Sequence, residues 1–319
     1  MSCVKAQDTN ILQEISIIGK AQGTTYLIKY YSTDTLVHKI QIDSLLDVID
    51  LSMSTYRSES LITAFNKTAT REIQMDKPMK DVIQASFKYY KKTKGAFDIT
   101  VMPLVKLWGF GPNGFSKNPS THEIDSVLSY VGMKHLKTKK NTLIKKKENV
   151  SIDLNGIAQG YTVDVLAKYL SQMGIKQFIV ELGGEIRTKG TKPQGKFLIE
   201  IQRPYQQKEK STYKITLENL AITTSGTYEK QRYFNGKMIS HHINPFTGYP
   251  LENSIVSVTV IAKTAMEADA LDNYFMSLTP QKAIQAAEKM KNIEIYLIYN
   301  ENNVLKELQT SKFNKYIYN

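Results

Sequence analysis

Cysteine is nearly absent from this sequence of 319 residues, where Cys3 is the only one. A single thiol excludes a disulfide framework and a thiolate metal site. No apolar run approaches the roughly 20 residues that a membrane-spanning helix needs. No Walker loop occurs, which argues against a P-loop nucleotide site. The remaining composition, 41% hydrophobic and 23% charged, is that of an ordinary globular protein.

Acidic residues are also scarce, with 30 Asp plus Glu against 42 Lys plus Arg and a net charge of +12. This excess favours anionic partners: nucleic acid, an acidic membrane face or a phosphorylated ligand. The densest lysine run, residues 134–150, alternates around Asn141-Thr142 like a hairpin, which favours a solvated surface over a groove for a polyanion. No zinc-finger spacing or RNA-binding aromatic motif accompanies the run, so we predict no nucleic-acid partner.

The first residues, MSCVKAQDTN, lack the basic and apolar regions of a secretory signal. Two interpretations of Cys3 stay open at this point. It is either the lipidated first residue of a bacterial lipoprotein or an incidental cysteine. We predict that residues 1–14 are a flexible tail and that residues 15–319 form one domain.

The hydrophobic pattern predicts an α+β fold with a largely antiparallel sheet. Residues 15–31 indicate two strands around a glycine-containing turn, and residues 38–53 a helix with one apolar face. A second helix is expected from about Lys80 to Lys94, ended by Gly95. Residues 153–174 indicate a strand end, a tight turn and a helix. Further strands are expected at 177–182, 196–201, 213–217 and 253–262, with a hairpin over 292–308.

The stretch TAMEADALDNYF, residues 264–275, carries three carboxylates and no lysine or arginine. Thr264 and Glu267 have the spacing of a capping box, which accounts for Glu267. Asp269, Asp272 and Asn273 then share one helical face. Carboxylates near a core need compensation, and Mg²⁺, which prefers oxygen ligands, would supply it. A metal site and an exposed polar face both stay open on these residues alone.

Two further segments suit a phosphorylated ligand. In DLNGIAQG, residues 153–160, a turn leads into a helix whose first N–H groups attract phosphate, and a glycine carbonyl there can bind a metal. In SHHINPFTGYP, residues 240–250, His241 and His242 stand in a turn-rich loop. Adjacent histidines in such a loop indicate acid–base chemistry, although a purely structural turn explains them equally well.

Six blocks, taken in order, resemble the ApbE family, the FAD:protein FMN transferases. They are GTTYLIKY, MSTYRSESLITAFN, GAFDITVMPLVKLWGFGP, DLNGIAQGYTVD, ELGGEIRTKG and TTSGTYEK…SHHINPFTGYP…TAMEADALDN. The resemblance covers about residues 20 to 280. It implies a single ApbE-like catalytic domain related to the T-fold.

The resemblance also implies an activity. Such enzymes use Mg²⁺ to transfer FMN from FAD to a threonine or serine of an acceptor flavoprotein, such as a redox-complex subunit, and release AMP. They act at the periplasmic face of the bacterial inner membrane, often through a lipid anchor, which favours the lipoprotein interpretation of Cys3. An FAD pyrophosphatase that shares the site, and a flavin-binding lipoprotein without chemistry, remain as alternatives.

Site residues follow by motif. The resemblance implies a metal site at Asp269, Asp272 and Asn273 with the Gly156 carbonyl, and it makes His241 the general base. It places contacts to FAD at Gln22, Tyr56, Ala96, Phe97, Asp98, Asp153, Gln159 and Ile243. The chain departs from the usual pattern where Gln22 replaces Met, Gln159 replaces Lys, Asn244 replaces Asp and Asn273 replaces Thr. Each substitute keeps hydrogen-bonding capacity, so we expect the site to be retained.

Overall fold

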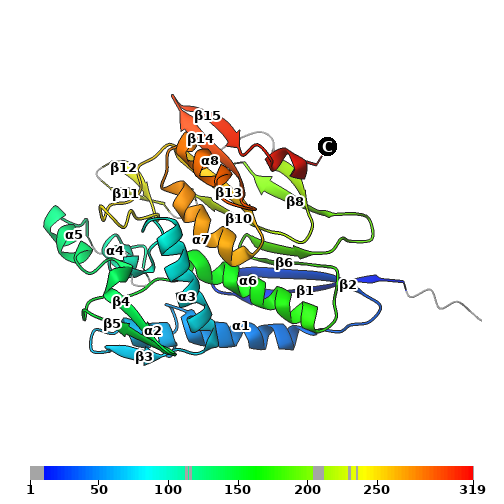
Figure 1. Cartoon of the computed structure of the whole chain (residues 1–319), viewed down its shortest axis with the longest axis horizontal. Coiled ribbons are helices and arrows are strands. Elements are labelled where there is room, and N and C mark those ends of the chain that lie inside the picture. The colour runs from blue at the N-terminus through cyan, green and yellow to red at the C-terminus, as the bar shows by residue number, and fades with distance from the viewer. Residues whose placement is uncertain are drawn as a thin grey trace, which may run out of the picture.

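The computed structural model describes residues 11–111, 114, 117–203, 212–228, 231–234 and 236–318. Cys3 and most of the predicted tail lie outside these residues. One antiparallel sheet of eight strands dominates the described part (Figure 1). In sheet order its strands are β1 (Gln13–Ala21), β2 (Thr24–Ser32), β6 (Phe178–Leu182), β7 (Glu185–Lys189), β10 (Ala221–Gly226), β13 (Ile255–Ala262), β14 (Glu294–Glu301) and β15 (Val304–Gln309).

Three small sheets surround the large one. They are a three-stranded sheet of β3 (Glu72–Gln74), β5 (Thr142–Lys145) and β4 (Leu136–Lys139), and two hairpins, β8 (Phe197–Gln202) with β9 (Thr212–Leu217) and β11 (Gln231–Phe234) with β12 (Lys237–Ser240). Every strand pair in the described residues is antiparallel. The expected α+β fold with a largely antiparallel sheet is therefore confirmed.

Helices cover one face of the large sheet, with α6 and α7 lying against it, α1 lying beside α6 against β1, and α3 packed on α1, α6 and α7 (Figure 1). The helices are α1 (Lys39–Met53), α2 (Leu61–Asn66), α3 (Lys77–Lys92), α4 (Met102–Leu107), α5 (Thr121–Leu128), α6 (Asn155–Gln172), α7 (Ala265–Met276) and α8 (Pro280–Glu288), with short 3₁₀ turns at Ile99–Val101, Met133–His135 and Phe313–Tyr316. No helix of the described residues is long and apolar enough to span a membrane.

The central strands are buried on both faces. On β13, Val258 and Val260 pack toward α7 in the largest apolar cluster, while Ile261 belongs to a separate cluster that β8 and β9 cover from the other side. A third cluster joins α1 and α6 to β1, β2 and β6. Because helices cover one face and a hairpin the other, the middle of the sheet is a rigid platform for α6 and α7.

Local chemistry explains the first hairpin. Ala21 pairs with Thr24, so only Gln22 and Gly23 form the turn, and both have positive φ angles of 53° and 76°. Two such residues are the signature of a type I′ turn, which matches the twist of the flanking strands. The two strands expected over residues 15–31 are thus confirmed, although β1 begins at Gln13, inside the predicted tail.

Two sequence expectations are wrong in detail. The helix expected from Lys80 begins at Lys77, because the Asp76 side chain accepts a hydrogen bond from Met79 N and Pro78 suits the first turn. It ends at Lys92, before Gly95. Residues 151–154 belong to no strand, because the backbone enters α6 directly. The other expected strands and the helix over residues 38–53 are present.

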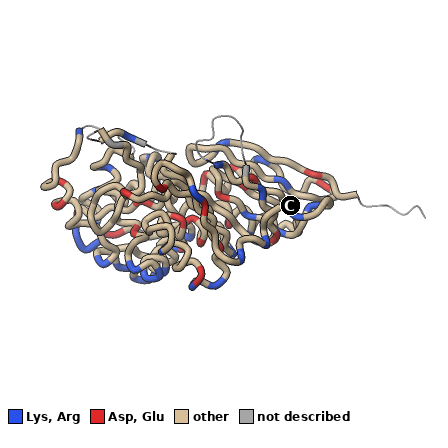
Figure 2. Tube along the Cα trace, turned by 90° about the horizontal axis from the view of Figure 1, so that it is seen from above, with Lys and Arg blue, Asp and Glu red and all other residues tan. Residues whose placement is uncertain are grey.

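The lysine-rich run forms the β4–β5 hairpin, as its alternation predicted. Its lysines are exposed except Lys145, whose ammonium donates hydrogen bonds to the Phe65 and Lys67 carbonyls. Figure 2 shows Lys and Arg gathered at the end of the molecule where β4 and β5 lie, on the left in both views. The hairpin is therefore a solvated basic surface rather than the lining of a groove.

Candidate active site

Helix α7 carries the acidic face that the sequence singled out. Thr264 caps its start by accepting a hydrogen bond from Glu267 N. The other half of the expected capping box is absent, because the Glu267 carboxylate pairs with Lys92 at 3.2 Å instead. Asp269 and Asp272 are 4% and 2% exposed, so an exposed polar face is excluded for both carboxylates.

Glycines in α6 let the two helices approach each other closely. A Cβ on Gly160 would lie 2.4 Å from Ala265 O, and a Cβ on Gly156 would lie 2.8 Å from Asn273 Nδ2. Gly156 also leaves the helical backbone, with φ −87° and ψ 21°. The structure thus brings the start of α6 and the acidic face of α7 together, and it places Gly156 beside Asn273.

Hydrogen bonds fix the two carboxylates. Asp269 Oδ2 accepts from Gly160 N at 2.8 Å. Asp272 Oδ2 accepts from Thr223 Oγ1 at 3.2 Å, and its Oδ1 accepts from Asn273 Nδ2 at 3.0 Å. All of these partners are neutral, and in the described residues no Lys or Arg pairs with either carboxylate.

Uncompensated burial shifts the titration of both acids. Burial, opposed by the Gly160 hydrogen bond and reinforced by the charge of Asp164, raises the pKa of Asp269 to about 7. Burial, followed by the charge of Asp269, raises the pKa of Asp272. Burial of each negative charge and repulsion between the two carboxylates both cost free energy. A bound cation would offset both costs, so the pair favours cation binding.

These residues fit a hard divalent cation, which takes oxygen ligands. Within the described residues there is no group of three or more His, Cys, Asp and Glu that could hold a metal. The donor set would instead be two carboxylates completed by an amide oxygen and a main-chain carbonyl. For Asn273 to offer oxygen beside Gly156, its amide must rotate by half a turn and release Asp272 and His242.

A cavity of about 230 Å³ opens next to this contact between α6 and α7. Ten of the residues predicted for the site line it: Ala96, Phe97, Asp98, Asp153, Gly156, Gln159, His241, Ile243, Asp269 and Asn273. Asp272, the remaining predicted carboxylate ligand, does not line the cavity. These segments are far apart in the sequence, so the fold assembles one site from four separate stretches.

Gln22 and Tyr56 do not line the cavity. Gln22 stands in the β1–β2 turn, where its Nε2 donates to Thr162 Oγ1 at 2.9 Å. Tyr56 is 65% exposed. These two predicted contacts can only reach a ligand that extends beyond the cavity.

Two predicted contact residues are held by structural hydrogen bonds. Asp98 Oδ1 accepts from Thr100 N at 2.8 Å, and its Oδ2 accepts from Met133 N at 3.2 Å. Burial raises the pKa of Asp98 against these bonds. Asp153 Oδ1 accepts from Asn155 N at 2.9 Å and fixes the entry to α6. Both carboxylates line the cavity, and their hydrogen bonds also fix the backbone that forms its wall.

The adjacent histidines lie together at the cavity, with ring centroids 4.1 Å apart. The His241 ring meets the edge of Phe110 at 6.4 Å. His242 is buried, and its Nδ1 lies 2.9 Å from Asn273 Oδ1. Burial lowers the pKa of His242, opposed by Asn273 and the Gly226 backbone. Neutral His242 is therefore the form that contacts Asn273 on α7.

Sequence reasoning missed several lining residues. They are Ile99, Val101, Val105, Phe110, Asn155, Gly183, Glu185, Thr224 and Ser225. Thr224 and Ser225 lie on β10, in the block TTSGTYEK that the resemblance had marked without singling out a residue. Phe110 lies within the GAFDITVMPLVKLWGFGP block in the same way, so complete blocks would have been a better guide than single positions.

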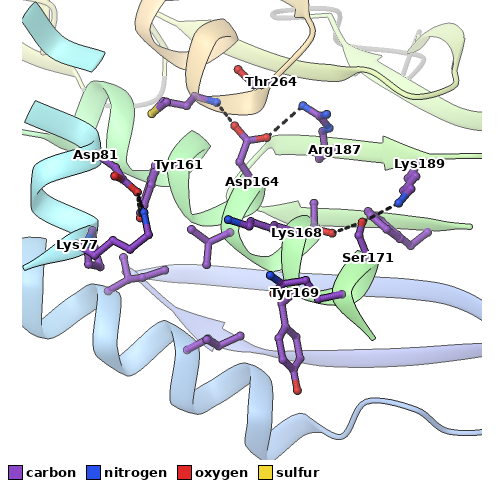
Figure 3. A pocket seen from close by; sticks show the side chains of 18 of the residues that line it. Lys77, Asp81, Tyr161, Asp164, Lys168, Tyr169, Ser171, Arg187, Lys189 and Thr264 are labelled. Carbon is purple, nitrogen blue, oxygen red and sulfur yellow. Dashed lines mark hydrogen bonds and ion pairs between the residues drawn. The ribbon is translucent and has the colours of Figure 1, made fainter. Parts of the chain in front are cut away.

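A second groove, of about 770 Å³, runs along α6 between α1, α3, β7 and the start of α7 (Figure 3). None of the predicted site residues lines it. Asp164, on α6, points toward the start of α7, where its oxygens accept from Ala265 N at 3.1 Å and Met266 N at 3.0 Å. Arg187 pairs with Asp164 at 3.2 Å and also donates to the Lys263 carbonyl. Asp164 and Arg187, which both line this groove, thus fix the start of α7.

The architecture is that of solved flavin transferases. The flavin transferase ApbE from Vibrio cholerae superposes with a TM-score of 0.87 at 34% identity, covering 96% of this chain and 100% of that one. The flavinyl transferase ApbE from Pseudomonas stutzeri, in its apo form, gives a TM-score of 0.87 at 29% identity, covering 98% and 99%.

Curated relatives agree with the structural neighbours. The FAD:protein FMN transferase of Haemophilus influenzae is 35% identical over 316 residues, which are 94% of this chain and 91% of the relative. The enzyme of the same name from Escherichia coli is 33% identical over 95% of this chain and 90% of its own length. A model described as the ApbE family matches residues 22–297. The chain belongs to the ApbE family, as the six sequence blocks predicted.

Proposed function

We propose that this chain is an FAD:protein FMN transferase, which moves FMN from FAD to a threonine or serine hydroxyl of an acceptor protein and releases AMP. The observation that carries the proposal is the cavity at the contact between α6 and α7, which Gly156, Asp269 and Asn273 all line and where Asn273 lies beside Gly156. Simple flavin binding would not require two buried carboxylates that have no basic partner among the described residues, beside a helix start that attracts phosphate. The names of the relatives support the same activity.

In this proposal Asp269, Asp272 and Asn273, with the Gly156 carbonyl, hold Mg²⁺. When bound, the metal neutralises the pyrophosphate of FAD and the charge that develops on the departing AMP. The chain itself contributes the fixed geometry: Gly160 N orients Asp269, and Thr223 orients Asp272. The start of α6 supplies backbone N–H groups that attract phosphate.

His241 is the proposed general base. The acceptor oxygen bonds to the flavin-side phosphorus, the bond from that phosphorus to the bridging oxygen breaks, and AMP leaves with that oxygen. The acceptor proton passes to the His241 imidazole. His242 is the weaker candidate, because it is buried and lies against Asn273. Its contact with the Asn273 amide must be released before Asn273 offers its oxygen to the metal.

Pockets that enclose a drug-sized ligand measure roughly 300–1,000 Å³, and this cavity measures about 230 Å³. The cavity is therefore too small to enclose FAD. Part of FAD therefore lies outside it. Phe97 and Ile243 give the cavity an apolar wall for an aromatic ring. Gln22 and Tyr56 lie outside the cavity, where they would contact the remainder of the ligand.

The expected periplasmic location and the lipid anchor at Cys3 stay predictions, since Cys3 lies outside the described residues. They are consistent with the proposed acceptors, which are flavoprotein subunits of membrane redox complexes. Mass spectrometry of the protein isolated from its native membrane would identify a diacylglyceryl group on Cys3, and its absence would refute the anchor.

Incubation with FAD and Mg²⁺, with and without an acceptor protein, separates the candidate activities. Transfer gives one FMN on the acceptor by intact mass, with AMP in solution. FMN and AMP in the tube without acceptor would identify an FAD pyrophosphatase, in which water replaces the hydroxyl. FAD bound but unconsumed in both tubes would identify a flavin-binding protein.

A further inference from the structure

An acceptor protein must bring its hydroxyl to His241, so the residues flanking that hydroxyl must contact the surface around the cavity. This inference rests on the proposed function. His241 follows β12 directly. Since each strand residue advances the chain by roughly 3.3 Å, Met238 lies about 10 Å along the chain from His241. A side chain two to four residues from the acceptor hydroxyl reaches that distance.

The β11–β12 hairpin presents an apolar face at this position. Tyr233 and Met238 are directly paired across the two strands, and they are 74% and 52% exposed. On the opposite face, the Phe234 ring packs edge-on against Trp108 at 4.9 Å, and Ile239 is buried. The hairpin is thus anchored to the body of the protein, while its outer apolar pair is left exposed by the described part of the chain.

A third exposed apolar side chain, Phe246, follows the histidines and is 61% exposed. Its ring atoms lie 3.3 Å from where a Cβ on Gly95 would stand, next to the Ala96–Asp98 wall of the cavity. Trp108 also anchors this turn, since its Nε1 donates to Gly248 O at 2.7 Å. We call Tyr233, Met238 and Phe246 the apolar rim.

Single exposed hydrophobic side chains are common and need no explanation. Ile18 and Val304, for example, are comparably exposed, but they lie on β1 and β15 at the two edges of the large sheet. The rim differs because Trp108 fixes both of its segments and both adjoin the cavity. Its composition also matches protein interfaces, where Tyr, Phe and Met are enriched.

We propose that the apolar rim binds the polypeptide of the acceptor protein next to its flavinylated threonine or serine. The partner it fits carries an apolar side chain within about three or four residues of the acceptor hydroxyl. Contacts at this distance from the reacting atoms increase the affinity for the acceptor. They leave FAD binding and the chemical step unchanged.

The test compares rim variants with a matched control. The acceptor probe is the protein of the native cell extract that gains one FMN in the presence of this enzyme, FAD and Mg²⁺, and it is then purified. The rim variants are Tyr233→Ser with Met238→Ser, and Phe246→Ser. The control is Ile18→Ser with Val304→Ser, which removes comparable exposed apolar surface elsewhere. Tyr233→Phe with Met238→Leu keeps the rim apolar.

We expect the double serine rim variant to raise KM for the acceptor about tenfold or more, with kcat and FAD affinity as in the wild type. The control and the Phe/Leu variant should keep wild-type KM. A KM within twofold of wild type in both rim variants would overturn the inference. So would a parallel loss of kcat and FAD affinity, or an oligomeric state in sedimentation that differs from the wild type without a change in KM. If the wild type labels no protein of the extract, the proposed function itself fails.

Discussion

Replacement of Asp269 by asparagine should make the metal-free protein more stable while it removes Mg²⁺ binding. The Asp269 carboxylate is buried against neutral partners, and its pKa is raised from 3.8 to about 7. At roughly 1.4 kcal/mol per pKa unit, ionised Asp269 destabilises the folded state by about 4 kcal/mol. Water entering the empty site reduces this cost, so we expect a gain between about 1 and 4 kcal/mol near pH 8.

The sign of the pH dependence follows from the same shift. A carboxyl whose folded pKa is raised takes up a proton on folding, so the free energy of unfolding falls as pH rises from 3.8 to about 7. Between about pH 5.5 and about pH 8 the metal-free wild type should lose roughly 2 kcal/mol through Asp269. The asparagine variant should not lose this amount, because it has no proton to release.

Urea unfolding in chelator, at these two pH values, measures both quantities. Added Mg²⁺ should stabilise the wild type, and more so at the higher pH, while the asparagine variant should not respond. A metal-free variant less stable than the wild type near pH 8 would contradict a destabilising charge on Asp269. A pH-independent wild type would refute it too, because Asp269 would then have a compensating partner.

Three further changes test the remaining parts of the site. His241→Ala should lower kcat for transfer by roughly 10²–10⁴ by removing the proposed base, with FAD affinity retained in a fluorescence titration. Gly160→Ala should lower Tm and weaken Mg²⁺ binding, because its methyl group would lie 2.4 Å from Ala265 O and push α7 from α6. Asp164→Asn should cost about 1 kcal/mol of unfolding free energy and weaken Mg²⁺ binding, because an amide offers one acceptor oxygen to the two N–H groups that start α7.

Each of these predictions has a contradicting outcome. Wild-type transfer by the His241 variant would show that another group is the general base. An unchanged Tm in Gly160→Ala would mean that the helices can separate without loss. Wild-type Mg²⁺ affinity in Asp164→Asn, together with normal stability, would show that the start of α7 is held without this carboxylate.

Helical spacing was sufficient to predict the acidic face of α7, because residues at i, i+3 and i+4 meet whatever surrounds the helix. Whether that face was buried could not be read from the same residues, since burial depends on β10 and α6. The role of Glu267 was predicted wrongly because it, too, depends on a contact outside the helix. Its partner, Lys92, stands 175 positions away in the sequence, and no local pattern contains it.

The strands were predictable from alternation and from turn residues such as Gln22-Gly23, which are local properties. The assembly of the cavity was not, because it depends on the close crossing of α6 and α7 that Gly160 permits. The contact of His242 with Asn273 is likewise a tertiary contact, 31 residues apart. Only the resemblance to a family grouped these segments before the fold was known.

The most direct test of the account is the ratio of AMP released to FMN bound on the acceptor, measured at increasing Mg²⁺ for the wild type and for Asp269→Asn. We expect one AMP for each FMN transferred, a rate that rises to saturation with Mg²⁺, and no transfer by the variant. Transfer that persists in chelator, or that the variant carries out at the wild-type rate, would contradict a metal-dependent site on α7.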